Sequence, residues 1–273
     1  MRLICLVDNS VQSGSALWGE HGLSFLIETD GGKVLWDTGQ SGTVLAHNLE
    51  ILGLTSISLA AIALSHAHYD HTGGLETALK FFPGTPIYAH PNIFQERYSQ
   101  GAKGMRSIGL QSRSEDLQQR CELHLSDDPQ EIVPGVWTTG GIHHRPFLQG
   151  ASVRHFVRQG EGVGPDRYED DMSLILRTGD SFALLAGCCH AGLRNTVETA
   201  HKVYLDRMSA VVGGTHLADV TLGELSGIVT MLEREKTSAL YLNHCTGEGA
   251  LFGLRERLGM RVHPCPAGTV IEF

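Results

Sequence analysis

The chain has 273 residues and is 41% hydrophobic, which is enough apolar material for one large domain with a sizeable core. Lys and Arg total 21 against 30 Asp and Glu, and the net charge of −9 disfavours binding to a nucleic-acid backbone. No apolar run reaches the length of a membrane span, and six cysteines without a C-x-x-C pair favour a reduced, cytoplasmic protein without a zinc knuckle.

The first ninety residues predict short strands that alternate with helices. Asp30-Gly31-Gly32 is a strong turn signal between two apolar runs and predicts a hairpin. The residues from Val44 have helical spacing, which stops at Gly53. The expected strands are Arg2–Val7, Ser24–Thr29, Lys33–Asp37, Leu59–Leu64 and Pro86–Ala89, and the expected helices are Val44–Leu52 and Gly74–Phe82.

Residues 92–130 are polar and weakly periodic, and we interpret them as a lid-like insertion within a single domain that spans residues 1–273. Strand and helix patterns resume after the insertion, so strand-to-helix units recur in both halves of the chain. The expected strands there are Val133–Thr139, Ser173–Arg177, Phe182–Ala186, Ala210–Val212 and Ala239–Leu242, and the expected helices are Thr196–Asp206 and Leu222–Glu235.

The segment LSHAHYDHTGGL places three histidines and one aspartate directly after a buried strand. His66 and His68 are two residues apart, so on an extended segment they point to the same side. Asp70 and His71 follow as the chain turns toward Gly73-Gly74, and these glycines let the chain turn away from the ligands. Leaving so many ionisable groups without a partner at the end of a buried strand would be costly, which indicates a metal site.

Three more expected strands end in histidine, at His190, His216 and His244. Strand ends at one edge of a sheet point into one crevice, so we expect these side chains to join the first cluster. The expected site holds two divalent ions, with zinc first and manganese or iron as alternatives. His66, His68 and His190 would hold one ion, and Asp70, His71 and His244 would hold the other. His216 is either a further ligand or a substrate contact.

These motifs resemble the signature of the metallo-β-lactamase superfamily. HAHYDH matches its main motif, VLWDTG (Val34–Gly39) its early aspartate motif, and GCCHAG and NHCTG its later histidine segments. The resemblance implies an α/β fold, a four-layer αββα sandwich, with the metals along one edge of the two sheets. It also implies that Asp37 braces the site and that Asp70 helps to hold the reacting water.

The resemblance also points to catalytic residues and to one departure from the superfamily pattern. Many members have a bridging Asp or Cys after a later strand, where VVGGTHL offers glycines and then His216. Either His216 takes that role or the second ion has fewer protein ligands. The expected catalytic residues are therefore Asp70 and His216.

A narrower resemblance covers TTGGIHHR, YEDDMSLIL, GCCHAGLRNTV, VVGGTHL and NHCTG. These segments are similar to the branch labelled 7,8-dihydropterin-6-methyl-4-(β-D-ribofuranosyl)-aminobenzene 5′-phosphate synthase. That label implies formation of a C–N bond, in which a pterin methyl diphosphate loses pyrophosphate to an arylamine. Other members of the branch are described only as metal-dependent hydrolases.

Several residues near these motifs are candidates for holding the substrate. The helix expected after GCCHAG offers Arg194 to a phosphate, whereas Asn195 either caps that helix or joins in binding. Arg145, with Arg106 and Arg113, would hold an anionic group. Asp170 and Asp171 would either orient a ligand imidazole or bind a substrate amine. For Cys188, Cys189 and Cys245 we favour packing over metal binding.

Three functions fit this sequence. The first is a metallo-hydrolase that acts on a phosphorylated or pterin-like small molecule through a metal-held water. The second is the transferase, in which the same metals hold diphosphate as the leaving group. The third is a metal-binding protein without activity. The expected partner in the catalytic cases is a small-molecule substrate, and nothing in the sequence indicates an oligomeric state.

Overall fold

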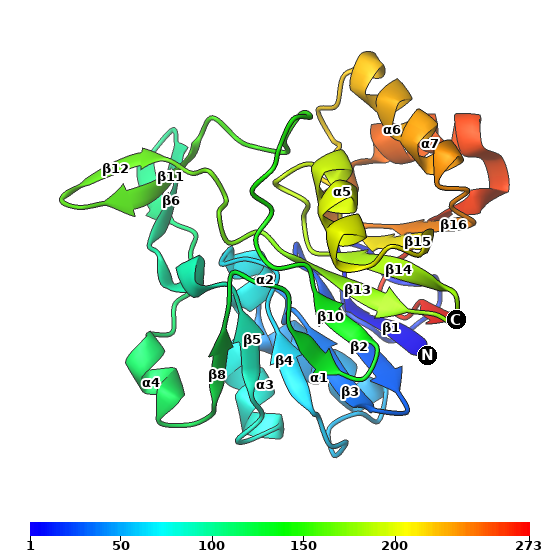
Figure 1. The fold of residues 1–273 in the computed structure, drawn as a ribbon. Helices are drawn as coiled ribbons and strands as arrows, with labels where there is room; N and C mark the ends of the chain where they lie inside the picture. The colour runs from blue at the N-terminus through cyan, green and yellow to red at the C-terminus, as the bar shows by residue number, and fades with distance from the viewer.

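The computed structural model describes residues 1–273 and has four layers, with two seven-stranded sheets face to face and helices outside them (Figure 1). This is the αββα sandwich expected from the sequence. The chain ends lie close together because the last strand pairs with the first, Arg2 opposite Glu272 (Figure 1). None of the helices has the length and apolar character needed to cross a bilayer.

The first sheet contains the predicted hairpin, in which Phe25 lies opposite Trp36. Its later strands run parallel to one another, so their carboxyl ends meet at one edge. In spatial order the strands are β18 (Val270–Glu272), β1 (Arg2–Val7), β2 (Ser24–Thr29), β3 (Gly32–Trp36), β4 (Ala61–Ala63), β5 (Ile87–Ala89) and β8 (Leu123–Leu125).

The second sheet has four parallel strands, β17 to β14, followed by antiparallel ones. The single strand expected at Val133–Thr139 is a hairpin instead, because Pro134-Gly135 forms a turn with Gly135 at φ +83°. In spatial order the strands are β17 (Val262–Pro264), β16 (Ala239–Leu242), β15 (Arg207–Gly213), β14 (Ser181–Ala186), β13 (Ser173–Arg177), β10 (Val136–Thr138) and β9 (Glu131–Val133).

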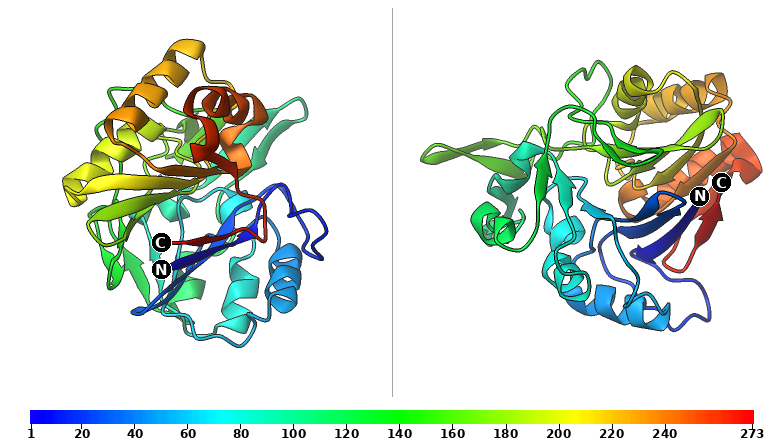
Figure 2. Two further views of the ribbon diagram at one scale, coloured as in Figure 1. Left: turned by 90° about the vertical axis from the view of Figure 1, so that its right-hand side faces the viewer. Right: turned by 60° about the horizontal axis from the view of Figure 1, so that its bottom comes forward.

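Helices cover the outer face of each sheet, as both views in Figure 2 show. The first sheet carries α1 (Gly42–Ile51), α2 (Tyr69–Thr72), α3 (Leu75–Phe81) and α4 (Ser114–Gln118). The second sheet carries α5 (Leu193–Val203), α6 (Leu222–Arg234) and α7 (Glu248–Leu258). The central core between the sheets includes Trp36 and Leu185, and each outer layer packs its own apolar cluster against the helices.

The structure has three helices that were not expected, α2, α4 and α7, and α5 has different bounds. Helix α5 begins at Leu193 rather than Thr196, because Leu193, Val197 and Ala200 form the stripe that packs on the second sheet. Helix α7 was not predicted, although Leu254 and Leu258 bury themselves in the same cluster.

The segment expected as an insertion divides into two parts. The strands β6 (Arg97–Gly101) and β7 (Gly104–Ser107) pair with β11 (His155–Gln159) and β12 (Gly162–Pro165) in a small third sheet. That sheet projects from the body at the left of Figure 1. Helix α4 and strand β8 instead belong to the first sheet and its outer layer. The projecting part is therefore smaller than residues 92–130 and includes a later hairpin.

Candidate metal centre

Three buried histidines face one another where the two sheets meet. His66 and His68 follow β4 of the first sheet, and His190 follows β14 of the second. Their ligand nitrogens lie within 4.8 Å of one another, and the Nε2 atom of each is buried without a hydrogen-bond partner. Such orphaned nitrogens are costly unless something binds them, so these three residues fit a metal ion.

The surroundings keep these imidazoles in the form that binds metals. Burial lowers the pKa of His66, His68 and His190 well below the usual value, so the rings are neutral at neutral pH. The other ring nitrogen of His190 donates to the Gly150 carbonyl at 2.9 Å, which directs its Nε2 toward the other two histidines.

A second group of ligands lies next to the first. The carboxylate oxygen Oδ2 of Asp70 is 3.4 Å from His244 Nε2 and 3.8 Å from His71 Nε2. His21, which sequence analysis missed, places its Nε2 3.2 Å from the same oxygen. His21 lies in a Gly-Glu-His-Gly loop, so its flanking glycines are the one local signal shared with the predicted histidines.

Asp37 supports this second group through its contact with His71, as expected. Its Oδ2 atom lies 2.7 Å from His71 Nδ1, and it accepts hydrogen bonds from the backbone and hydroxyl of Ser65. Burial lowers the pKa of His71, but the Asp37 carboxylate outweighs it and raises that pKa to about 9. The carboxylate thus holds a proton on Nδ1 and directs Nε2 at Asp70 and His244. An ion bound at Nε2 would displace the second proton, which this pKa keeps on the ring at neutral pH.

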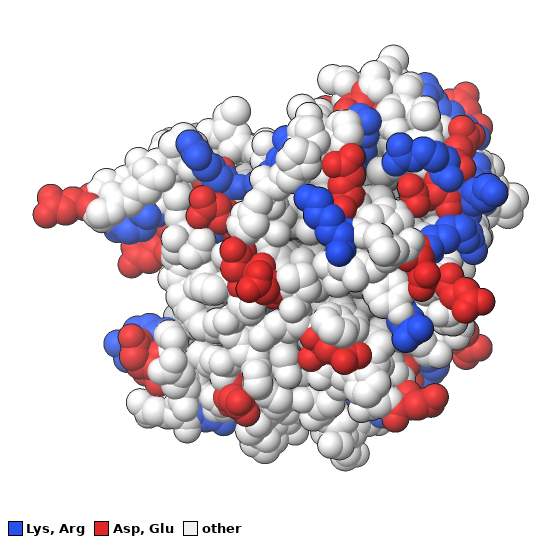
Figure 3. All heavy atoms as spheres, viewed as in Figure 1, with Lys and Arg blue, Asp and Glu red and all other residues white.

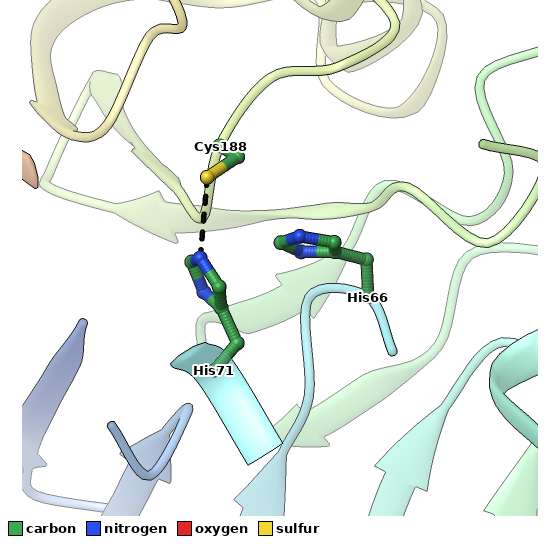
Figure 4. Close-up of side chains that lie close together, drawn as sticks. All are labelled: His66, His71 and Cys188. Atoms are coloured by element: carbon green, nitrogen blue, oxygen red, sulfur yellow. Dashed lines mark hydrogen bonds between the residues drawn. The ribbon is translucent and has the colours of Figure 1, made fainter. Parts of the chain in front are cut away.

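Cys188 lies between the two groups, where we had expected only packing. Its Sγ is 3.1 Å from His71 Nε2, and the ligand atoms of Cys188, His66 and His71 lie within 4.8 Å of one another (Figure 4). The same sulfur forms a second such group with His190 and His216. Cys189 instead packs in the outer apolar cluster of the second sheet, as predicted.

Backbone strain concentrates around these side chains. Six residues other than glycine have a left-handed backbone, and all but one lie at or next to the site. They are Asp37, Tyr168, Cys189, His216 and His244 near the site, and Lys236 elsewhere. Each such conformation costs free energy, and strained residues of this kind are typical of functional sites.

The site opens into two adjoining cavities. The smaller, of about 120 Å³, is lined by the ligand groups and by Tyr69, Arg106, Ile108 and His155. The larger, of about 640 Å³, shares His155 and His216 with it and has apolar walls from Leu217, Val220 and Ile228. His216 therefore separates the ligand groups from a space large enough for a small organic molecule, and its Nδ1 is buried without a partner.

The residues expected to bind substrate have other positions. Asp171 and Asn195 are completely buried and bond to protein backbone. Neither side chain reaches a cavity, so the prediction that they contact the substrate is wrong. Arg145 donates to the carbonyls of Ile142, Arg167 and Tyr168. Arg194 stacks on the Phe147 ring at 3.6 Å and pairs with Glu224, away from the ligand groups.

The sequence profile of the Metallo-beta-lactamase superfamily matches residues 17–188, which include the first cluster of ligands. The chain belongs to the metallo-beta-lactamase superfamily. The profile ends at Cys188, so His190, His216 and His244 lie beyond the matched part and enter the site through the fold.

Two proteins of Methanocaldococcus jannaschii are similar to this chain over most or all of its length. One, named 7,8-dihydropterin-6-methyl-4-(beta-D-ribofuranosyl)-aminobenzene-5'-phosphate synthase, is 28% identical, with 100% of this chain and 97% of the relative covered. An uncharacterised protein is 30% identical over 92% of this chain and 93% of its own length. A crystal structure described as a metal-dependent hydrolase of the beta-lactamase superfamily has a TM-score of 0.84 and 27% identity, with 100% and 99% of the two chains covered.

Proposed function

We propose that this protein is a dinuclear metalloenzyme that acts on a phosphorylated or pterin-like small molecule. The observation that carries the proposal is the set of three buried, unpartnered Nε2 atoms beside the Asp70 group, at the wall of a cavity. His66, His68 and His190 would hold one divalent ion, and Asp70, His71 and His244 the second. Two ions bound in this way supply Lewis acidity for phosphoryl oxygens and lower the pKa of a water molecule.

The two cavities support a small-molecule substrate. Arg106 lines the smaller cavity with its guanidinium over the Tyr69 ring, and no carboxylate pairs with it. It is therefore the cation best placed to hold a substrate phosphate beside the ligand groups. The larger cavity with its apolar walls would take a ring system. Acidic side chains are interspersed with basic ones over the face in Figure 3, as suits a small-molecule partner better than nucleic acid.

A second candidate, the transferase, is favoured by the named relative that matches the full length of the chain. In that reaction the bond between a pterin methyl carbon and a diphosphate oxygen breaks, a C–N bond to an arylamine forms, and the amine loses a proton. The residues that would hold the diphosphate are the same. The two functions differ in the nucleophile and in the atom attacked, which is carbon for the arylamine and phosphorus for a metal-held water.

The two candidates predict different dependence on a second substrate. For the transferase, we expect pyrophosphate release from a dihydropterin methyl diphosphate only when an arylamine phosphate is added. For the hydrolase, we expect turnover of that diphosphate or of a generic phosphodiester with water alone. Pyrophosphate assays with and without the arylamine distinguish them, and metal binding without any turnover would contradict both.

Cys188 predicts the character of the bound ions. A thiolate suits zinc or iron better than manganese, and cobalt bound to a thiolate absorbs in the near ultraviolet. We expect this absorption in cobalt-loaded wild type, its loss in Cys188→Ser, and its retention in Cys189→Ser, whose side chain packs in the apolar cluster. A band that survives in Cys188→Ser but disappears in Cys245→Ser would move the thiolate ligand to Cys245.

We further propose that the protein works in the cytoplasm. All six cysteines are free, and Cys188 and Cys245 have ligand atoms within 4.8 Å of each other without forming a disulfide. A reducing compartment keeps such a pair available as thiols.

A further inference from the structure

The turn before β13 carries two adjacent buried carboxylates, and each binds the backbone beside a different metal-site histidine. Asp170 Oδ2 accepts a hydrogen bond of 2.8 Å from the N–H of Ala67, which lies between His66 and His68. Asp171 Oδ2 accepts one of 2.7 Å from the N–H of Ala191, which follows His190. Both carboxylates are at most 1% exposed, so water does not compete for these bonds.

These two bonds join loops that belong to different sheets. The Ala67 loop follows β4 of the first sheet, whereas the Ala191 loop follows β14 of the second. Two further contacts hold the same turn in place. The Met172 N–H donates to the Ser65 carbonyl at 3.0 Å, and the Tyr168 ring stacks on His190 at 4.2 Å with only 13° between the planes.

The projecting third sheet reaches this turn through Arg97 and through His155, whose Nδ1 bonds the Tyr168 hydroxyl at 2.9 Å. Arg97, on β6, is 1% exposed and forms ion pairs with Asp170 at 2.7 Å and with Asp166 at 3.1 Å. Its guanidinium also donates to the carbonyls of Asn92 and Gln95. A buried guanidinium with this many fixed partners holds its carboxylates in one geometry, because any displacement would leave a buried charge unpaired.

We propose that Asp170 and Asp171 are positioning residues that set the separation of the two loops bearing His66, His68 and His190. Arg97 extends this brace into the third sheet, so that this sheet tunes metal affinity without contacting the ion. This assigns the sheet a role beyond covering the cavity. The proposal rests on the metal centre of the proposed function, and its test separates the two.

A three-nitrogen site tolerates little error in the distance between its loops, since a productive constellation must be held to within about 0.5 Å. The loops come from separate sheets, and neither the sheet ladders nor the central core fixes residues beyond the strand ends. Two consecutive carboxylates on one turn span this gap, one bonded to each loop. Disturbing groups that support metal ligands weakens affinity by about 10- to 100-fold, which is the effect expected here.

The test is the zinc affinity of apo-protein, measured by competition with a chromophoric chelator. Asp171→Leu keeps the size of the side chain but has no acceptor for the Ala191 N–H, so its affinity should fall about 10- to 100-fold. Asp171→Asn keeps an acceptor oxygen and should restore affinity to within about threefold of wild type. Glu235→Gln is the control, because Glu235 is a mostly buried carboxylate that pairs with His201 and contacts neither the turn nor the ligand loops.

Arg97→Lys tests the link to the third sheet. It also provides a second test of the brace if Asp171→Leu does not fold. Lysine keeps the charge but cannot reach all the partners of the guanidinium, so affinity should fall by more than about threefold. The visible spectrum of the cobalt-loaded variant should change as well. Unchanged affinity and spectrum in folded Asp171→Leu, or in Arg97→Lys, would overturn the brace. A wild-type protein that binds no zinc would instead contradict the proposed metal centre.

Discussion

Replacing His68 by alanine is expected to remove one equivalent of bound metal and to lower kcat/KM by more than about 100-fold. Removing a group that only supports a metal ligand already lowers metal affinity or activity by up to about 100-fold, so removing a ligand itself should lower it further. His68 Nε2 is one of three buried histidine Nε2 atoms without a hydrogen-bond partner, so no other side chain takes its place. Metal content by elemental analysis and turnover of the diphosphate substrate measure the two effects.

His143→Ala is the matched control for this variant. His143 is exposed and pairs with Asp127, and neither residue lines the cavity of the ligand groups. The His143→Ala variant should bind the full complement of metal and turn over substrate at the wild-type rate. Full metal content and activity in His68→Ala would show that the three-histidine group is not the metal site.

Replacing Gly74 by alanine is expected to lower the free energy of unfolding by about 1–3 kcal/mol, the cost of forcing extra atoms into a packed core. A Cβ at this position would lie 2.1 Å from the Thr38 carbonyl oxygen, an impossible contact with backbone. Thr38 in turn donates from its N–H and its hydroxyl to the His71 carbonyl, so the displacement would reach the metal ligands. Chemical denaturation followed by circular dichroism measures the loss.

Gly249→Ala supplies the comparison, since a Cβ there meets nothing within 4 Å and the residue lies in helix α7. Its stability should stay the same or rise by about 0.5 kcal/mol, because alanine is the better helix former. Equal stability of the two variants would mean that the loop after Asp37 moves freely, contrary to the close packing described above.

The glycines of the LSHAHYDHTGGL segment form the expected turn and have a further role. Sequence analysis assigned Gly73 and Gly74 to a turn that keeps the chain clear of the ions. In the structure they admit the carbonyl oxygens of Gln40 and Thr38, which lie 2.0 and 2.1 Å from where the missing Cβ atoms would be, far inside van der Waals contact. The restriction comes from a loop more than thirty residues away, which no local pattern records.

The sequence by itself determined the features that depend on neighbouring residues. Alternation and turn signals located the hairpin β2–β3, and the spacing of His66, His68, Asp70 and His71 marked the ligand segment before any fold was known. The histidines at later strand ends were predicted to converge, because parallel strands share an edge whatever lies between them.

Only the tertiary structure decided which other side chains join the site. His21, Cys188 and Arg97 carry no spacing signal, and the sequence left Asp171 open between orienting a ligand imidazole and binding a substrate amine. Each acquires its position from contacts across long stretches of chain, such as that of Arg97 with Asp170. Local propensity acts over a few residues, whereas burial and charge pairing are settled when the two sheets close, and these roles appear only then.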